Sequence, residues 1–366
     1  MDSMKLEDCC EILDSQRVPI TGSDRTSGDY PYYGANGIQD YVDDFIFDDE
    51  LVLLAEDGGN FGSKTRPIAY RVSGKCWVNN HAHVLKPKAG LDVDYLCYSL
   101  MFYDVGGMVN GATRQKLTQA AMRQMIIPKR SLDEQIEIVN IIKKVQGVIA
   151  SRKEELEQLD LLIKARFVEL FGDININDKN WKYEPLGELC TIVRGGSPRP
   201  IEQFLGGDVP WIKIGDATDG DSIYLNSTKE HIIQEGIKKS RLVKEGSLIF
   251  ANCGVSLGFA RIITFDGCIH DGWLAMEDID ERLDKVFLLQ ALNQMTEHFR
   301  AIAPAGTQPN LNTAIMKAYK QVIPPIELQR EFINFAKQVT KSKVAVQKAL
   351  DETQILFDSL MQEYVG

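Results

Sequence analysis

The sequence is a duplication, because short patterns of its first half recur in the same order in its second half. Residues 52–58 (VLLAEDG) correspond to residues 248–254 (LIFANCG), 196 positions later. Further matches at offsets of 194 to 196 are Leu117 with Leu311, Met122 with Met316, Pro128 with Pro324, and Gln135 with Gln329. A repeat of this length is far longer than a solenoid repeat, so each copy should be a domain. The 366 residues are also too many for one compact core.

The first part of each copy has the pattern of an α+β globular domain. Short apolar runs, such as residues 51–55 (LVLLA) and 246–250 (GSLIF), alternate with turns rich in Gly, Asn and Asp. Turn clusters at a spacing of about ten residues are typical of strands joined by loops. Helical patterns are interspersed near residues 92–104 and 283–301. We therefore expect a globular domain of roughly 130–145 residues at the start of each copy.

The end of each copy has the pattern of a long helix. Residues 133–171 contain no proline and one glycine, and their apolar residues recur in alternating steps of four and three, interrupted only by Arg152 and Arg166. The same series recurs 194 positions later, where Lys343 and Thr353 are the exceptions. Such a repeat predicts a helix with a coiled-coil seam. The predicted seam residues are Ile138, Ile142, Val145, Ile149, Leu156, Leu159, Ile163, Leu170, Phe332, Val339, Val346, Leu350, Phe357 and Leu360.

One long helix cannot bury its own apolar stripe, so each helix needs a partner. We favour pairing of the two helices within the chain; the alternatives are packing of each helix on its own globular domain, or pairing between chains. At 1.5 Å per residue, each helix is a rod of roughly 50–60 Å. The predicted fold class is α+β, with two similar globular domains, two long antiparallel-paired α-helices and a pseudo-two-fold internal repeat. The expected boundaries are residues 1–130 and 176–325 for the globular domains, and 131–175 and 326–366 for the helices.

Several short motifs make the chain resemble the specificity subunit of a type I restriction–modification system over essentially its whole length. They are residues 30–38 (YPYYGANGI), 167–172 (FVELFG), 186–190 (LGELC), 194–198 (RGGSP), 210–213 (PWIK), 323–329 (IPPIELQ) and 356–361 (LFDSLM). The resemblance implies two target recognition domains, each reading one half of a bipartite double-stranded DNA target, with the helices as spacers. It also implies two methyltransferase subunits docked on the helices, with nuclease–translocase subunits joining the complete enzyme.

The sequence predicts no catalytic residue, cofactor or metal site. Residues 58–65 (GGNFGSKT) are similar to a phosphate-binding loop, but Ser63 stands before Lys64 where that motif needs glycine. The Asn-Pro-Pro-aromatic or Asp-Pro-Pro-aromatic tetrapeptide expected of an amino-methyltransferase does not occur. His81 and His83 would place two rings on one face of a strand, as a metal site could use, but no third ligand is evident. A structural or polar-contact role is therefore favoured for both histidines.

The overall charge argues at first against nucleic acid. The chain has 41 Lys and Arg against 52 Asp and Glu, a formal charge of −11, whereas DNA-binding domains usually have a basic footprint. The acidic run Asp43, Asp44, Asp48, Asp49, Glu50, Glu56 and Asp57 is expected to face away from phosphate. Basic and amide side chains nevertheless gather in predicted loops, and these residue types contact phosphates and base edges. The predicted DNA-binding residues are Asn60, Lys64, Arg66, Arg114, Gln115, Lys116, Arg194, Ser197, Arg199, Lys213, Lys238, Lys239, Arg241, Gln308 and Asn310.

An acidic chain can read DNA if another subunit supplies most of the phosphate neutralisation. The leading hypothesis is thus a non-catalytic DNA sequence-recognition subunit that scaffolds methyltransferase and nuclease–translocase subunits. The alternatives are a helical interaction scaffold without DNA reading and a cryptic DNA-modifying enzyme.

The seven cysteines form no Cys-x-x-Cys pair, and no apolar run is as long as a membrane span. We therefore expect a cytoplasmic protein without membrane contact.

Overall fold

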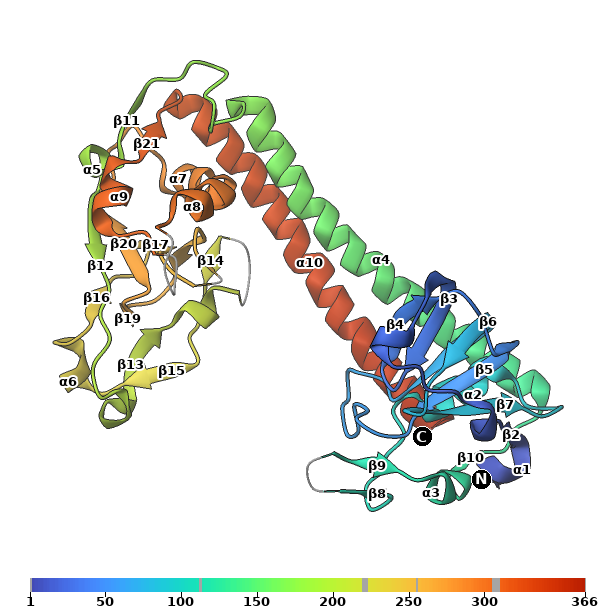
Figure 1. Cartoon of the computed structure of the whole chain (residues 1–366). Coiled ribbons are helices and arrows are strands. Elements are labelled where there is room, and N and C mark those ends of the chain that lie inside the picture. The colour runs from blue at the N-terminus through green and yellow to red at the C-terminus, as the bar shows by residue number, and fades with distance from the viewer. Residues whose placement is uncertain (1, 112–113, 219–222, 255, 305–309, 366) are drawn as a thin grey trace. The chain divides into compact units, whose positions relative to one another are not determined.

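The chain folds into two compact units (Figure 1). The computed structural model describes residues 2–111, 114–218, 223–254, 256–304 and 310–365. The first unit comprises residues 1–154 and 347–366, and the second unit comprises residues 155–346. Each unit therefore combines one globular domain with parts of both long helices. None of the helices among the described residues has the length and apolar character needed to cross a membrane.

The first unit is built on a six-stranded sheet. Its elements are β1 (Ser3–Lys5), α1 (Leu6–Cys9), β2 (Cys10–Ile12), the 3₁₀ turns Asp14–Gln16 and Gly22–Asp24, β3 (Ser27–Gly34), β4 (Gly37–Val42), β5 (Phe47–Ala55), β6 (Ala69–Val78), β7 (Ala82–Pro87), α2 (Val93–Met101), β8 (Val109–Asn110), β9 (Lys116–Leu117), α3 (Gln119–Arg123) and β10 (Ile126–Pro128). The strand order is β2-β7-β5-β6-β3-β4, and β3 runs parallel to β6. Leu54 and Leu85 share a core with Leu96 of α2, while Leu51 and Leu53 lie in a separate core. The alternation of neighbouring residues between two cores is that of a strand buried on both faces.

The second unit contains a five-stranded and a four-stranded sheet. Its elements are β11 (Tyr183–Pro185), α5 (Leu186–Leu189), β12 (Thr191–Arg194), the 3₁₀ turns Ile201–Gln203 and Ile214–Thr218, β13 (Leu205–Ile212), β14 (Tyr224–Leu225), β15 (Glu230–Ile232), α6 (Gln234–Ile237), β16 (Arg241–Val243), β17 (Leu248–Ala251), β18 (Ala260–Ile263), β19 (Gly267–Ile269), β20 (Trp273–Glu277), α7 (Lys285–Gln294), α8 (Thr296–Ile302), α9 (Thr313–Ala318) and β21 (Lys320–Val322). The strand orders are β12-β20-β17-β18-β14 and β15-β13-β19-β16.

The duplicated sequence has a duplicated structure. Strand β5 lies between β7 and β6 as β17 lies between β20 and β18. The register agrees as well, since Leu54 faces His83 and Phe250 faces Leu274. The long strand β6 corresponds to both β18 and β19, because its parallel pairing with β3 is matched by that of β19 with β13. The expected α+β class and internal repeat are confirmed.

Two long helices, α4 (Leu132–Phe171) and α10 (Ile326–Tyr364), contribute to both units. A capping box starts α4: the Glu134 carboxylate accepts the Ser131 backbone N–H at 2.8 Å, and the Ser131 hydroxyl accepts the Glu134 N–H at 3.3 Å. This exchange satisfies two backbone donors that have no partner within the helix.

The two helices pair in antiparallel orientation within each unit. In the first unit, Ile142 from the first half of α4 shares a core with Phe357 near the end of α10. In the second unit, the rings of Phe167 and Phe332 lie 5.4 Å apart, and the former belongs to the end of α4 and the latter to the start of α10. The same second-unit core includes Phe287 of α7. Pairing within the chain and packing on the globular domain, which were alternatives from the sequence, therefore occur together.

The predicted seam residues are all buried or half-buried in the structure. Two of the polar interruptions of the seam form ion pairs between the helices. Lys343 Nζ lies 2.6 Å from a carboxylate oxygen of Asp160, and an Arg166 guanidinium nitrogen lies 2.6 Å from a Glu331 oxygen. Polar pairs along an apolar seam favour one register over others.

Candidate nucleic-acid interface

In the first unit, the loop after β5 meets the segment that leads into β9. The Leu117 N–H donates to the Glu56 carbonyl at 2.7 Å, and the Gly58 N–H donates to the Gln115 carbonyl at 3.2 Å. These backbone bonds bring Arg114, Gln115 and Lys116 beside the loop 56–68, which carries Asn60, Lys64 and Arg66. The first-unit cluster, defined as these six predicted residues, is thus assembled from two segments that are far apart in sequence.

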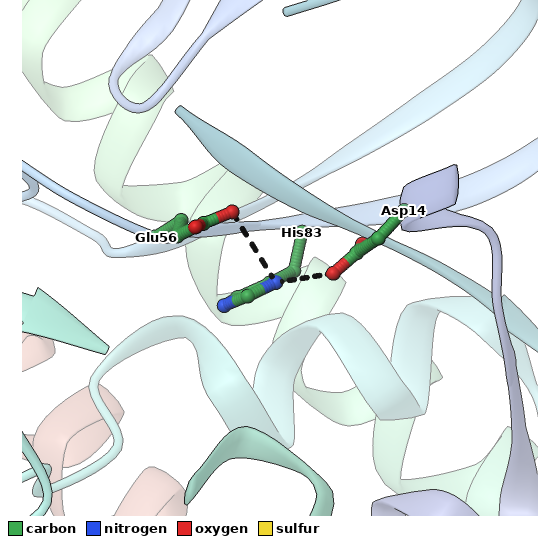
Figure 2. A group of neighbouring side chains, drawn as sticks. All are labelled: Asp14, Glu56 and His83. Carbon is green, nitrogen blue, oxygen red and sulfur yellow. Dashed lines mark hydrogen bonds and ion pairs between the residues drawn. The ribbon is translucent and has the colours of Figure 1, made fainter. Parts of the chain in front are cut away.

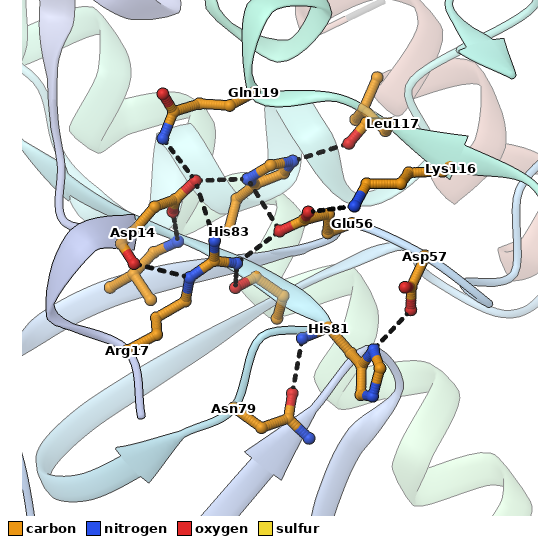
Figure 3. Close-up of polar contacts among 12 residues, drawn as sticks. Asp14, Arg17, Glu56, Asp57, Asn79, His81, His83, Lys116, Leu117 and Gln119 are labelled. Atoms are coloured by element: carbon orange, nitrogen blue, oxygen red, sulfur yellow. Dashed lines mark hydrogen bonds and ion pairs between the residues drawn. The ribbon is translucent and has the colours of Figure 1, made fainter. Parts of the chain in front are cut away.

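Asp57 binds Arg114 of the first-unit cluster. Arg114 Nη2 donates to Asp57 Oδ1 at 2.8 Å, and His81 Nδ1 lies 2.7 Å from the same oxygen (Figure 3 shows the latter contact). The Arg114 side chain is still 59% exposed, so it remains accessible to a ligand. Lys64 and Arg66 are exposed, and no ion pair is recorded for either within the described part of the chain.

In the second unit, the predicted residues gather around the turn between β19 and β20. Arg194 Nε donates to the Asp271 carbonyl at 3.0 Å, and the Ser197 hydroxyl donates to the Asp271 carboxylate at 2.7 Å. An Arg199 nitrogen lies 3.9 Å from that carboxylate. Burial alone would raise the pKa of Asp271, but the bond from Ser197 and the nearby charges lower it below its usual value. The carboxylate therefore anchors the loop that carries these basic side chains.

Two glycines allow that loop to approach the turn closely. A Cβ on Gly195 would lie 2.2 Å from the His270 carbonyl oxygen, and one on Gly196 would lie 2.9 Å from the Lys239 carbonyl oxygen. The Ser240 hydroxyl donates to the Gly196 carbonyl at 2.8 Å. The segment 238–241, with its three predicted basic residues, is thereby fixed beside the loop 194–199.

Asn310 and Lys213 join the same region. The Asn252 side chain donates to Asn310 at 3.3 Å, and the Asn252 backbone N–H donates to the Gly272 carbonyl at 2.9 Å. Lys213 pairs with Glu230, and its Nζ lies 5.9 Å from the centroid of the Trp211 ring, which contacts the ring of His270. The second-unit cluster is defined as the described members of the prediction: Arg194, Ser197, Arg199, Lys213, Lys238, Lys239, Arg241 and Asn310. Gln308, the remaining prediction, lies outside the described residues.

A cavity of about 510 Å³ opens at the second-unit cluster. Its lining includes Ser197, Arg199, Trp211 and His270. Trp211 is 4% exposed and therefore serves mainly as a wall of the cavity rather than as a free stacking platform. His270 Nδ1 accepts the Gly272 N–H at 2.9 Å, and burial lowers the pKa of the imidazole.

One part of each cluster occupies an equivalent place in the repeat. Lys116 forms a β-bridge with Asp57, and Asn310 forms one with Cys253. The offsets, 194 and 196 positions, are those of the sequence repeat. The fold therefore presents the same edge twice, with Arg114, Gln115 and Lys116 on one copy and Asn310 on the other.

Two findings concern the acidic run and the histidines singled out in the sequence. Glu56 and Asp57 do not lie apart from the basic residues, because they bind Lys116 and Arg114 directly. His83 does have nearby oxygen ligands that the sequence did not reveal, since Asp14 and Glu56 come within reach of its ring (Figure 2). Asp14 is 69 positions away from His83, and no local spacing links the two.

The Asp14–Glu56–His83 group contains residue types that can bind a metal ion. Their ligand atoms, however, are already engaged in contacts with other protein groups. His83 Nδ1 lies 2.7 Å from Asp14 Oδ2 and 3.7 Å from Glu56 Oε2. Arg17 Nη1 donates to the same Glu56 oxygen at 2.5 Å. Burial alone would raise the pKa of both carboxyls, but hydrogen bonds and neighbouring cations lower both below their usual values. The ligand atoms are thus already bound to protein cations, and the group is an ionic network (Figure 3).

Comparison with known proteins adds evidence from sequence. The family model of the type I restriction modification DNA specificity domain matches residues 1–161 and 178–353. A Haemophilus influenzae protein that carries the description of a type I restriction enzyme specificity subunit is 30% identical over 342 residues, which are 90% of this chain and 85% of that protein. A type I restriction enzyme specificity subunit of Methanocaldococcus jannaschii is 23% identical over 331 residues, covering 82% of this chain and 74% of the relative.

Solved structures of this class share the fold. The S subunit of a type I restriction–modification system from M. genitalium superimposes with a TM-score of 0.58 at 15% identity, covering 99% of this chain and 95% of that one. A chain from a structure on complex assembly and conformational transition of the type I R-M system gives 0.63 at 16% identity, with 100% and 96% covered. The duplicated α+β fold and the match of the family model along both halves lead to one conclusion: the chain belongs to the type I restriction–modification DNA specificity family.

Proposed function

We propose that this chain is the DNA sequence-recognition subunit of a type I restriction–modification enzyme. Residues 1–130 and 176–325 are the two target recognition domains, and each reads one half of a bipartite double-stranded DNA target. The observation that carries this proposal is the gathering of basic and amide side chains in one region of each copy of a duplicated fold. Such side chains are suited to phosphate oxygens and base edges.

In each cluster, some side chains are suited to phosphate contacts, which position the protein on DNA, and others are suited to base contacts, which read the sequence. Exposed lysines such as Lys238 and Lys239 suit phosphates, because an ammonium acts as a flexible point charge. Arg194 and Arg199 present guanidinium groups that can form paired hydrogen bonds to guanine. Asn60 and Gln115 carry amides, which can make paired bonds to adenine.

The helices at residues 131–175 and 326–366 act as the spacer and as the docking surface for two methyltransferase subunits. Nuclease–translocase subunits join this assembly in the complete enzyme. With a formal charge of −11, the chain provides sequence discrimination, and the methyltransferase subunits provide most of the phosphate neutralisation. The chain itself has no catalytic role, needs no cofactor and acts in the cytoplasm.

A methylome comparison of host cells with and without the chain tests this function. Loss of one bipartite methylated motif is the expected result, whereas an unchanged methylome would leave only a scaffold without DNA reading. Methyl transfer by the purified chain with a methyl donor would instead reveal a modifying enzyme. Exchange of residues 1–130 for another recognition domain should then change one half of the motif, and a change of both halves would refute the two-reader assignment.

A further inference from the structure

The buried ionic network of the first unit joins the base of the first-unit cluster to the sheet. We propose that His83 is a positioning residue, which holds the segment of Arg114, Gln115 and Lys116 in place for reading one DNA half-site. The inference rests on the proposed function, because it concerns how one of the two recognition domains achieves its selectivity. It assigns to His83 a role that neither core packing nor direct DNA contact provides.

Both nitrogens of the His83 ring lie within hydrogen-bond distance of an oxygen. Nδ1 lies 2.7 Å from a carboxylate oxygen of Asp14, and Nε2 lies 2.9 Å from the carbonyl oxygen of Leu117. The completely buried ring therefore bridges the Asp14 carboxylate to the backbone of β9 through both of its nitrogens.

The network contacts the chain at three residues within or directly after the segment of Arg114, Gln115 and Lys116. His83 binds the carbonyl of Leu117, Lys116 Nζ lies 2.9 Å from Glu56 Oε1, and Gln119 Nε2 donates to Asp14 Oδ2 at 2.8 Å. Figure 3 shows these contacts converging on the same two carboxylates. A network of several hydrogen bonds and ion pairs restricts the position of this segment more than a single contact would.

Arg17 holds the opposite side of the network. Its guanidinium donates to Glu56 and, at 2.7 Å, to the Ala82 carbonyl, and its Nε donates to the Asp14 carbonyl at 2.9 Å. Arg17 thus links the Glu56 carboxylate to strand β7 and to the turn after β2, and the Val84 N–H of β7 donates to the Asp14 carboxylate at 2.9 Å. Both carboxylates therefore also have partners outside residues 114–119.

The second unit shows that the fold does not require these charges. Leu274 pairs with Phe250 as His83 pairs with Leu54, and Asn252 stands in the place of Glu56. The Leu311 N–H still donates to the Asn252 carbonyl at 2.8 Å, as the Leu117 N–H does to Glu56. The backbone contact is shared by both copies, but the ionic network belongs to the first copy alone among the described residues. A buried ion pair is weak evidence for stability, and the fixing of one specific geometry is an attested use of such pairs.

The test compares the His83→Gln variant with the unchanged chain, each assembled with its methyltransferase subunits. Binding is measured to DNA targets with single base-pair changes in either half-site. The substitution removes the imidazole ring and at least one of its two hydrogen bonds. We expect discrimination to fall roughly tenfold in one half-site, which is within the usual effect of a base mismatch, and to stay unchanged in the other. The second half-site is an internal control for folding and assembly.

Two further variants separate positioning from general destabilisation. Val72→Ala opens a cavity in the other core of the sheet, where Val72 is 2% exposed, and it should leave discrimination at both half-sites intact. Gln119→Leu removes the hydrogen bond to Asp14 and leaves His83 in place. It should lower discrimination at the same half-site as His83→Gln, but by a smaller factor. Unchanged discrimination in a folded Gln119→Leu complex, or equal relaxation by Val72→Ala, would overturn the inference. If the unchanged complex prefers no sequence in either half-site, the proposed function fails instead.

Discussion

Gln135 and Gln329 make the same three hydrogen bonds, one in each unit. The Gln135 amide accepts the Asp92 N–H at 2.7 Å and donates to the carbonyls of Gly90 and Arg130. Gln329 accepts the Asp284 N–H at 2.8 Å and donates to the carbonyls of Arg282 and Pro324. Both side chains are fully buried. Each glutamine thus locks the start of a long helix to the N-cap of a helix in the globular domain.

Replacement of either glutamine by leucine should destabilise its own unit. Gln135→Leu leaves the Asp92 N–H and two carbonyl groups without their buried partner, which costs about 1–3 kcal/mol for an unsatisfied group. Urea unfolding followed by circular dichroism measures the change, and Gln329→Leu should give a similar value. The exposed Gln354→Leu is the matched control and should shift the free energy of unfolding by less than about 0.5 kcal/mol.

Truncation of Phe167 should weaken the packing of α4 and α10 on the globular domain of the second unit. The ring is 1% exposed and contacts Phe171, Phe287 and Phe332. Phe167→Ala is expected to lower the free energy of unfolding by about 3–5 kcal/mol, because it removes apolar contacts and leaves a cavity. Val168→Ala, at a side chain that is 50% exposed, should have little effect in the same denaturant titration. Equal effects of both variants would contradict the observed packing.

The basic residues of the second-unit cluster should differ in their salt dependence. Lys238→Ala is expected to weaken DNA binding by the assembled complex equally for all sequences and to reduce the salt slope by about one. Lys182→Ala removes the same charge from an exposed side chain outside the cluster and should leave the slope unchanged. Fluorescence anisotropy at several salt concentrations distinguishes the two outcomes, and identical slopes would remove Lys238 from the interface.

A matched pair of insertions tests the helices as a spacer. One heptad after Leu159 and one after Lys343 would preserve the Asp160–Lys343 ion pair and lengthen each helix by about 10 Å. That length equals about three base pairs, so the gap between the half-sites should widen by roughly that number. Methylome sequencing reads the new gap. Exchange of an existing heptad for another of equal length is the control, and an unchanged gap after the insertions would reject the spacer role.

The second unit should lose stability in mild acid through His270. Burial lowers the pKa of this histidine, whose Nδ1 accepts a backbone hydrogen bond. A histidine with a lowered folded pKa contributes stability above its unfolded pKa of about 6.5, and this contribution declines as the pH falls below that value. His270→Gln should flatten the pH dependence of the unfolding midpoint between about pH 7 and pH 5. A dependence that is just as steep in this variant would assign the effect to other groups.

The long helices could be predicted closely because their signal is local. The expected helical segment begins at residue 131, and α4 begins at Leu132. Pairing of the two long helices within the chain was favoured because their apolar series have matching register. Ser131 and Glu134 also carry a capping-box pattern, which could have fixed the first residue of α4.

The assembly of the candidate site could not be predicted in the same way. Asp57 and Arg114 meet across 57 positions, and Asp14 and His83 meet across 69. These contacts depend on the order of strands β2, β7 and β5, which residue spacing does not encode. Residue type alone identified the exposed lysines and arginines, but it could not identify the carboxylates that hold them.

The division of the helices between the units has a consequence for synthesis. Phe357, Met361 and Val365 belong to the hydrophobic core of the first unit, although the ribosome makes them after every residue of the second unit. Synthesis of the first unit therefore starts before that of the second unit and ends after it. Until residues 347–366 emerge, the apolar side of α4 around Ile142 remains open to water, to chaperones or to the same segment of another nascent chain.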